Sequence, residues 1–121
     1  MRNFKDLRVW NESMSIVRRT LAICQELPSQ LRYNVTEQII RSAISIPSNI
    51  SEGCSRSAKA LVNYLRIALG SSYELETQLL LLASLSPQHL EQLEMIGSEL
   101  NRLQRRLLKF ISSLKEFQES A

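Results

Sequence analysis

The chain has 121 residues, a formal net charge of +3 and a pI near 9.1. This length fits one domain, residues 1–121. The net positive charge is smaller than that of strong nucleic-acid binders, which have a dense basic surface. Three glycines, three prolines and few aromatic residues argue against an all-β fold with many tight turns. Composition therefore predicts an all-α protein.

Apolar residues spaced alternately three and four apart predict a first helix over residues 6–27. Its seam consists of Leu7, Trp10, Met14, Val17, Leu21 and Cys24. A second helix is predicted to begin with Thr36 as N-cap and to end at Gly53 as the C′ residue. Asn34, which tolerates the left-handed conformation, is expected in a turn before it.

The second helix keeps its apolar stripe through a proline. The stripe consists of Ile39, Ala43, Ile46 and Ile50. Pro47 removes a backbone donor at a cost of roughly 3 kcal/mol in a helix interior. The hydroxyls of Ser45 and Ser48 are expected to bond to freed carbonyls, and small residues nearby allow another backbone to approach. The pattern predicts a helix that is kinked but not ended at Pro47.

Two further seams predict the remaining helices. The seam of residues 57–85 consists of Leu61, Leu65, Ala68, Ser72, Leu75, Leu79 and Leu82. The seam after the cap Ser86-Pro87 consists of Leu93, Ile96, Leu100, Leu103, Leu107, Phe110, Leu114 and Phe117. Four long helices with short connections predict an antiparallel up-down-up-down four-helix bundle with a kinked second helix.

Some apolar residues lie off these seams. Leu79 to Leu82 point in four directions around the third helix, and Ile40 and Ile44 form a second apolar flank on the helix before it. Either the protein self-associates through these residues, or one chain packs them internally. The first interpretation predicts a homo-oligomer.

The sequence contains no residue set that indicates catalysis. It has one histidine, His89, and one aspartate, Asp6, and a Ser/His/Asp site would need both to meet a serine at one end of the bundle. Ser86 stands three residues before His89, so the Glu-x-x-His pair of di-iron bundles is absent, and isolated glycines form no phosphate-binding loop. We expect no enzyme activity, catalytic residue, metal or cofactor.

The two cysteines and the apolar runs of the chain indicate where in the cell the protein is expected. Cys24 and Cys54 lie on apolar stripes and are expected to be reduced core thiols. The N-terminus shows no apolar signal region, and the longest apolar run, Leu79 to Ala83, is too short to span a bilayer. The prediction is a cytoplasmic protein without a membrane partner.

Glu76 falls inside the apolar arc of the third helix, where an ionised carboxylate needs a partner. It is either a proton-handling acid or one half of an interhelix or intersubunit salt bridge, with an arginine such as Arg41. The second interpretation predicts that Glu76 is buried, whereas an acid such as Glu119 is expected to be exposed.

A basic stripe lies opposite the seam of the fourth helix, at positions i, i+3, i+4 and i+7. It consists of Arg102, Arg105, Arg106 and Lys109. Arg18 and Arg19 form a second candidate patch. The stripe is either a solvated face that complements the helix dipole or a binding site for nucleic-acid phosphates. No aromatic residue interleaves the stripe, so base stacking is not indicated.

The sequence closely resembles the four-helix-bundle proteins encoded in 23S ribosomal RNA intervening sequences. The residues that carry the resemblance are Phe4 to Trp10, Pro28, Tyr33, Thr36 to Gln38, Arg41, Ser45 to Ile50, Glu52, Gly53, Arg56, Ser57, Ala68 to Ser71 and Glu74 to Glu76. The resemblance implies a homopentamer without known enzymatic activity. Structural or interface roles are expected for Arg41, Pro47, Asn49, Glu52, Gly70 and Glu76.

The same fold is shared with accessory proteins of diversity-generating retroelements, which bind nucleic acid and a reverse transcriptase. The candidate partners are therefore further copies of this chain, RNA or DNA and, by analogy alone, a reverse transcriptase or another protein. Ile40 replaces the first arginine of an Arg-Arg pair usual in the family, and this weakens the case for nucleic acid. A protein-interaction scaffold is the alternative function.

Overall fold

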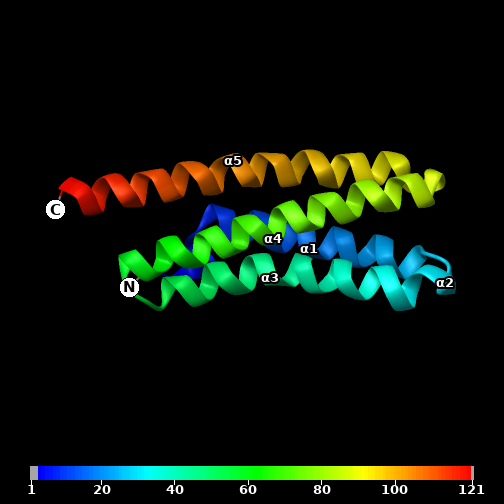
Figure 1. Ribbon diagram of the computed structural model, residues 1–121, viewed down its shortest axis with the longest axis horizontal. Helices are drawn as coiled ribbons and strands as arrows, with labels where there is room; N and C mark the ends of the chain where they lie inside the picture. Colours follow the sequence, from blue (N-terminus) through cyan, green and yellow to red (C-terminus); the bar gives the residue numbers. More distant parts are fainter. Residues whose placement is uncertain (1–2, 121) are drawn as a thin grey trace.

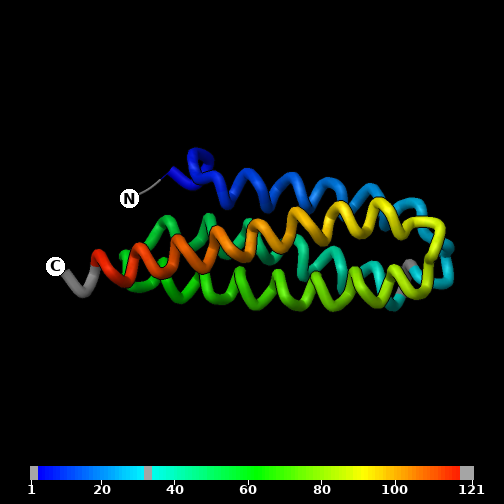
Figure 2. Tube along the Cα trace, turned by 90° about the horizontal axis from the view of Figure 1, so that it is seen from above, coloured from blue at the N-terminus to red at the C-terminus, as the bar shows by residue number. Residues whose placement is uncertain are grey.

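The computed structural model describes residues 3–120, and for residues 32, 33 and 118–120 it describes the backbone alone. Within that range four helices have 18 residues or more: α1 (Arg8–Glu26), α3 (Glu37–Cys54), α4 (Ala58–Leu85) and α5 (Leu90–Ser120). They lie lengthwise beside one another, consecutive helices run in opposite directions, and both chain ends lie at one end (Figures 1 and 2). No strand occurs in the described part of the chain, so the all-α prediction is confirmed.

Short helical segments make the connections. A 3-10 turn, η1 (Phe4–Asp6), precedes α1, and another, η3 (Pro87–His89), joins α4 to α5. The α1–α3 connection contains α2 (Ser29–Leu31) and the π-helical η2 (Arg32–Thr36). The predicted turn at Asn34 is wrong, because no non-glycine residue in the described range has a positive φ. Helical bonding instead continues from α2 into α3.

The start of α4 follows the expected chemistry of a helix cap. Ser57 has an extended backbone, and its hydroxyl accepts a hydrogen bond of 3.2 Å from the backbone N–H of Ala60. Thr36, by contrast, is already helical and makes no such bond at the start of α3. A cap is unnecessary there because the preceding π-helical residues continue directly into the helix.

Gly53 serves helix packing and does not end α3. It lies inside the helix, which runs to Cys54, and no described glycine has a positive φ, so the predicted C′ role is wrong. A Cβ atom added to Gly53 would lie 2.7 Å from Cβ of Tyr64 and 2.9 Å from Cδ1 of Leu61. The missing side chain therefore allows α3 and α4 to approach closely next to the loop that joins them.

The prediction that α3 continues through Pro47 is confirmed. The expected role of Ser45 is wrong, since its hydroxyl hydrogen-bonds across to the hydroxyl of Ser71 on α4 at 2.8 Å. Asn49 donates through Nδ2 to the Ser45 carbonyl at 2.8 Å. Hydrogen bonds from polar side chains on both sides of the proline thus stabilise this part of α3 and its contact with α4.

The buried side chains form one hydrophobic cluster between the long helices. The stripes predicted for α3 and α4 are buried throughout, whereas in α5 Phe110 is partly buried and Phe117 is exposed. In α1 the buried face is turned from the predicted seam. It consists of Val9, Ser13, Ile16, Val17, Thr20, Ile23 and Cys24. Ser13 and Thr20 tolerate burial because their hydroxyls donate to the Trp10 and Ile16 carbonyls at 2.7 Å.

α4 is apolar on all sides near its end, as predicted, and two of its leucines face solvent. Leu79 and Leu82 are buried, whereas Leu80 is 68% and Leu81 52% exposed. The second apolar flank on α3 is also present, because Ile44 is exposed and Ile40 is half-buried. No helix within residues 3–120 combines the length and the apolar content that a membrane crossing requires.

Candidate nucleic-acid interface

α5 carries the predicted basic stripe on its middle turns. Arg102, Arg105 and Lys109 are exposed, and Arg106 is half-buried because it turns toward α1. Arg102 donates to the Ser98 hydroxyl at 3.1 Å, an exposed contact within one helix. Three of the four cations can therefore meet a solvent-borne anion without breaking an interhelix ion pair.

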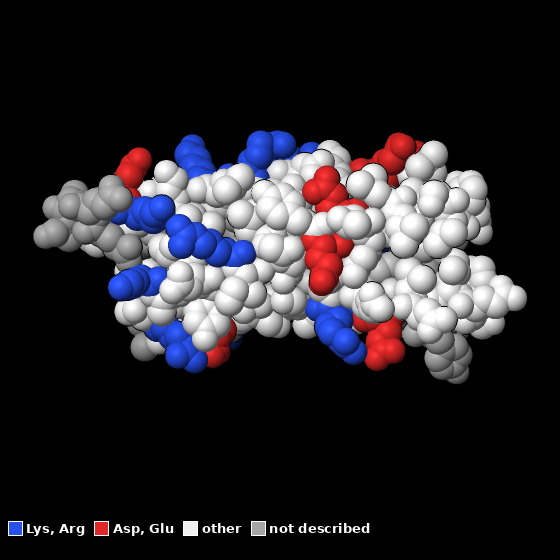
Figure 3. Space-filling view, viewed as in Figure 1, with Lys and Arg blue, Asp and Glu red and all other residues white. Residues whose placement is uncertain are grey.

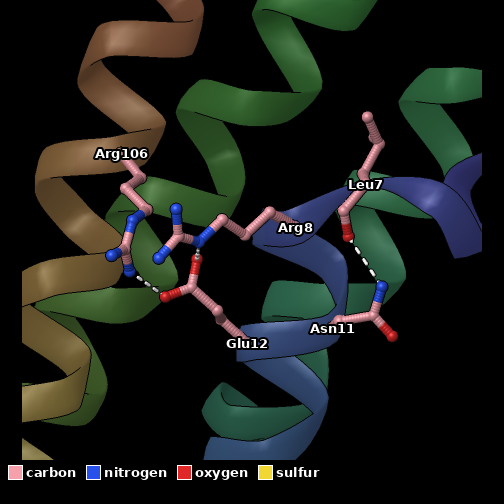
Figure 4. A network of polar contacts seen from close by, with 5 residues as sticks. All are labelled: Leu7, Arg8, Asn11, Glu12 and Arg106. Atoms are coloured by element: carbon pink, nitrogen blue, oxygen red, sulfur yellow. Dashed lines mark hydrogen bonds and ion pairs between the residues drawn. The ribbon is translucent and has the colours of Figure 1, made fainter.

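The fourth cation, Arg106, crosses to α1 and bonds to the Glu12 carboxylate (Figure 4). Nε of Arg8 lies 3.6 Å from the other oxygen of the same carboxylate. The start of α1 is fixed beside this pair, since Asn11 Nδ2 donates to the carbonyls of Leu7 and Lys5, at 2.9 Å each. One acid on α1 thus bonds to Arg106 of α5 and lies within ion-pair distance of Arg8 of its own helix.

In the second candidate patch, which lies on α1, one of the two arginines likewise forms an ion pair with another helix. Arg18 is exposed, whereas Arg19 forms an ion pair with Glu99 of α5. With the Arg106–Glu12 pair, this contact joins α1 to α5, which run alongside each other (Figure 2). Sequence reasoning missed Arg8 and both acids, although the i, i+4 spacing of Arg8 and Glu12 is itself a signal for a helix ion pair.

Charge is unevenly distributed over the molecule. On the face shown in Figure 3, Lys and Arg gather over the half that carries both chain ends, and the opposite end is largely uncharged. The exposed leucines at that opposite end, where α4 passes into α5, are Leu80, Leu81, Leu85 and Leu90. On this face, basic side chains therefore lie toward one end of the molecule and uncharged side chains toward the other.

Glu76 does not form the predicted interhelix salt bridge with Arg41. Its Oε1 accepts from Nε2 of Gln104 at 2.9 Å and its Oε2 from Nδ2 of Asn101 at 3.1 Å, both on α5. Asn101 also donates to Gln104 Oε1, at 3.0 Å. Two amide donors satisfy the half-buried carboxylate, so no arginine within the chain is required. A bond to another subunit stays a prediction.

Arg41 is exposed and lies 3.3 Å from Glu37, one turn earlier in α3. Gly70, another residue with an expected structural role, is exposed, and a Cβ added there would meet nothing within 4 Å. Neither residue is used in the packing of the chain on itself. The Glu119 side chain lies outside those that the structure describes.

Glu52 has a local role at the α3–α4 corner. Its carboxylate accepts from Arg56 at 2.7 Å and raises the pKa of that guanidinium above its ordinary value. The Arg56 guanidinium also lies 5.2 Å from the centre of the Tyr64 ring. Both contacts lie at the corner where Gly53 allows α3 to approach Tyr64 of α4.

A serine, a histidine and an acid lie close together in the structure, but the acid is Glu26 and not the Asp6 considered from the sequence. The Ser86 hydroxyl lies 2.8 Å from Nδ1 of His89, and Nε2 of His89 lies 3.3 Å from Glu26 of α1. Ser86 is 1% exposed, so its hydroxyl cannot reach a substrate. The contacts fasten the α4–α5 connection to the end of α1.

The thiols are buried in the core. Burial raises the pKa of Cys24 to about 11, which keeps the thiol protonated near neutral pH, and Cys54 is also buried. Among the described residues, no three His, Cys, Asp or Glu side chains come close enough together to hold a metal ion.

Comparisons with known proteins agree on one family. The model of the 23S rRNA-intervening sequence protein family matches residues 5–109. A solved structure, that of a protein of unknown function from the S23 ribosomal protein family of Bacteroides thetaiotaomicron, is 30% identical to this chain, with a TM-score of 0.78. The match covers 85% of this chain and 97% of the other. No curated protein matches the sequence.

Proposed function

The chain belongs to the 23S rRNA-intervening sequence protein family, and we propose that it is a non-enzymatic accessory protein that binds the backbone of RNA or DNA weakly and without sequence preference. In this proposal the unit is an antiparallel four-helix bundle in the cytoplasm. The observation that carries the proposal is the set of exposed cations on two neighbouring helices. They are Arg18, Arg102, Arg105 and Lys109.

The mechanism is charge neutralisation with release of counterions. Four phosphate contacts give a slope of log K against log salt of roughly −3, so one chain alone binds weakly at physiological salt. A homo-oligomer repeats the stripe and raises the apparent affinity through multiple contacts. Self-association is supported by Leu80 and Leu81, whose exposure leaves apolar surface for a second copy to cover, and the pentamer is supported by the family resemblance.

A salt titration tests the proposal. Fluorescence anisotropy with a structured RNA is measured between 50 and 300 mM salt for the parent and for Arg102→Gln/Arg105→Gln. The variant should bind less tightly to every sequence tested, with a slope shallower by about 2. The matched control, Arg41→Gln/Lys59→Gln, removes the same charge from α3 and α4 and should keep the parent slope. Equal slopes in the parent and the first variant would contradict the proposal.

A protein-interaction scaffold is the second candidate, and the exposed leucines Leu80, Leu81, Leu85 and Leu90 favour it. Light scattering separates the apolar contact from the nucleic-acid contact. Replacing Leu80 and Leu81 by Gln should lower the molar mass toward that of one chain if these residues mediate self-association. A parent protein that binds no RNA or DNA at 50 mM salt would leave the scaffold as the function.

A further inference from the structure

A groove of about 410 Å³ lies between the start of α1 and the second half of α5. Its apolar side chains are the buried Val9 and the partly buried Leu7 and Phe110. Its basic side chains are Arg8, Arg106 and Lys109. This volume lies near the lower end of the range for small-ligand sites, roughly 300–1,000 Å³. The groove therefore suits one ring system with charged groups attached.

The basic side chains are arranged for an anion. Glu12 bonds to Arg106, and its second oxygen lies 3.6 Å from Arg8, so both guanidinium groups converge on one carboxylate (Figure 4). Lys109 stands one helical turn from Arg106 and is exposed. Three cations share one acid, which leaves this groove positively charged. An anion placed beside the two arginines would reduce their mutual repulsion.

A comparable groove on the other side of α5 has the opposite charge. It has about 340 Å³ and is lined by apolar residues of α4 and α5, including Leu80 and Leu90. The charged residues that line it are Glu76 and Glu94. Both grooves therefore offer apolar surface, but an anionic ligand is attracted to the one beside α1 and repelled from the one beside α4.

We propose that the groove between α1 and α5 holds one unpaired nucleotide of a single-stranded nucleic acid. The base lies against Leu7 and Phe110, an aromatic residue next to the stripe whose place in the groove the sequence pattern did not indicate, and the adjoining phosphates contact Arg8 and Lys109. The inference rests on the proposed function and adds to it a preference for unpaired segments. Every base has an apolar face, so the groove accepts any sequence, whereas a duplex offers a base only after unstacking.

Labelled 12-nucleotide strands test the inference by anisotropy at 50 mM salt. The probes are oligo-U, oligo-A, a duplex of the same length, and an abasic strand with the same number of phosphates. The parent should bind both intact single strands roughly tenfold more tightly than the abasic strand, because stacking on an aromatic side chain contributes about that factor per base. The duplex carries twice as many phosphates but offers no unpaired base, so it should bind less tightly than the intact single strands.

Two matched variants locate the effect. Ser113 is exposed and lines the groove, so Ser113→Leu places an apolar side chain in it without changing charge. Ser112→Leu makes the same change at the exposed neighbouring position, which is not among the groove residues. Ser113→Leu should remove the tenfold preference and retain abasic binding, while Ser112→Leu should keep both. Melting curves check that both variants fold.

The failures of the two proposals differ in these measurements. If the intact and abasic single strands bind the parent equally, backbone binding stands and the groove inference is overturned. An equal loss of preference in both leucine variants would also overturn it. If no probe binds the parent, the proposed function fails and the inference fails with it.

Discussion

Three glycines in the long helices allow the helix packing to be tested with one kind of substitution. At Gly53 an added Cβ would lie 2.7 Å from Cβ of Tyr64, an atom fixed by the backbone of α4. Overpacking of this kind costs about 1–3 kcal/mol, and the gain from replacing a helical glycine by alanine is about 0.5–1 kcal/mol. Gly53→Ala should therefore destabilise the fold by about 1–2 kcal/mol.

The same substitution should have the opposite sign at Gly70 and Gly97. Both positions are inside helices, and a Cβ added at either would meet no other atom within 4 Å. Only the backbone gain of about 0.5–1 kcal/mol then remains, and both alanine variants should be stabilised. The expected difference between Gly53→Ala and the other two variants is about 2–3 kcal/mol.

Thermal unfolding and urea titration measure these differences. For a chain of this size, 1 kcal/mol shifts the melting temperature by roughly 4 °C, so Gly53→Ala and Gly70→Ala should melt about 8–12 °C apart. A Gly53→Ala protein that melts above the parent would refute the close approach of α3 and α4. If Gly70→Ala lowers the melting temperature, and does so more at high protein concentration, a second copy covers that position and the single-chain argument fails there.

Three further changes test individual contacts. Glu76→Gln should cost about 1–2 kcal/mol in urea unfolding, because two amide donors then share one acceptor oxygen, whereas the exposed Glu116→Gln should cost almost nothing. In a double-mutant cycle, Ser45→Ala and Ser71→Ala should couple by about 1 kcal/mol, and strict additivity would contradict their hydrogen bond. The pKa of a cysteine thiol is about 8.5 in an unfolded chain, and burial raises the pKa of Cys24 to about 11 in the folded protein. Burial of the neutral thiol should therefore contribute its full stability below about pH 8.5, and this contribution should be lost as the pH rises through about 11. Cys24→Ala should lack this part of the pH dependence.

Helix periodicity predicted most of what depends on one helix at a time. The stripe of α3 is fully buried on both sides of Pro47, and that of α4 is buried from Leu61 to Leu82. In α1 the predicted seam is buried only at Val17 and Cys24, because Ser13 and Thr20, which an apolar pattern leaves out, lie on the buried face. Their hydroxyls bond to their own helix, which makes them small core residues and turns the buried face away from Trp10 and Met14.

Helix periodicity could not predict the contacts between helices. Glu76 lies where the helix projection placed it, but its partners depend on which side chains of α5 face it, and periodicity carries no such information. Likewise, Arg106 belongs to the basic stripe by spacing, yet its position next to α1 pairs it with Glu12. The predicted binding surface loses one cation to that ion pair. It gains Arg8, which was not predicted because its role requires a neighbouring helix.

The separation of charge from apolar surface links assembly to anion binding. A contact through Leu80 and Leu81 would lie away from the end that carries the chain ends, and on the face shown in Figure 3 it would leave the basic half exposed. Each added copy then brings its own Arg102, Arg105 and Lys109 to the same polyanion. Because contacts on one ligand multiply, a ligand that spans several copies stabilises the oligomer by mass action. Weak binding per chain and effective binding by an assembly are therefore compatible, and in this proposal contacts through the exposed leucines would set how many copies act together.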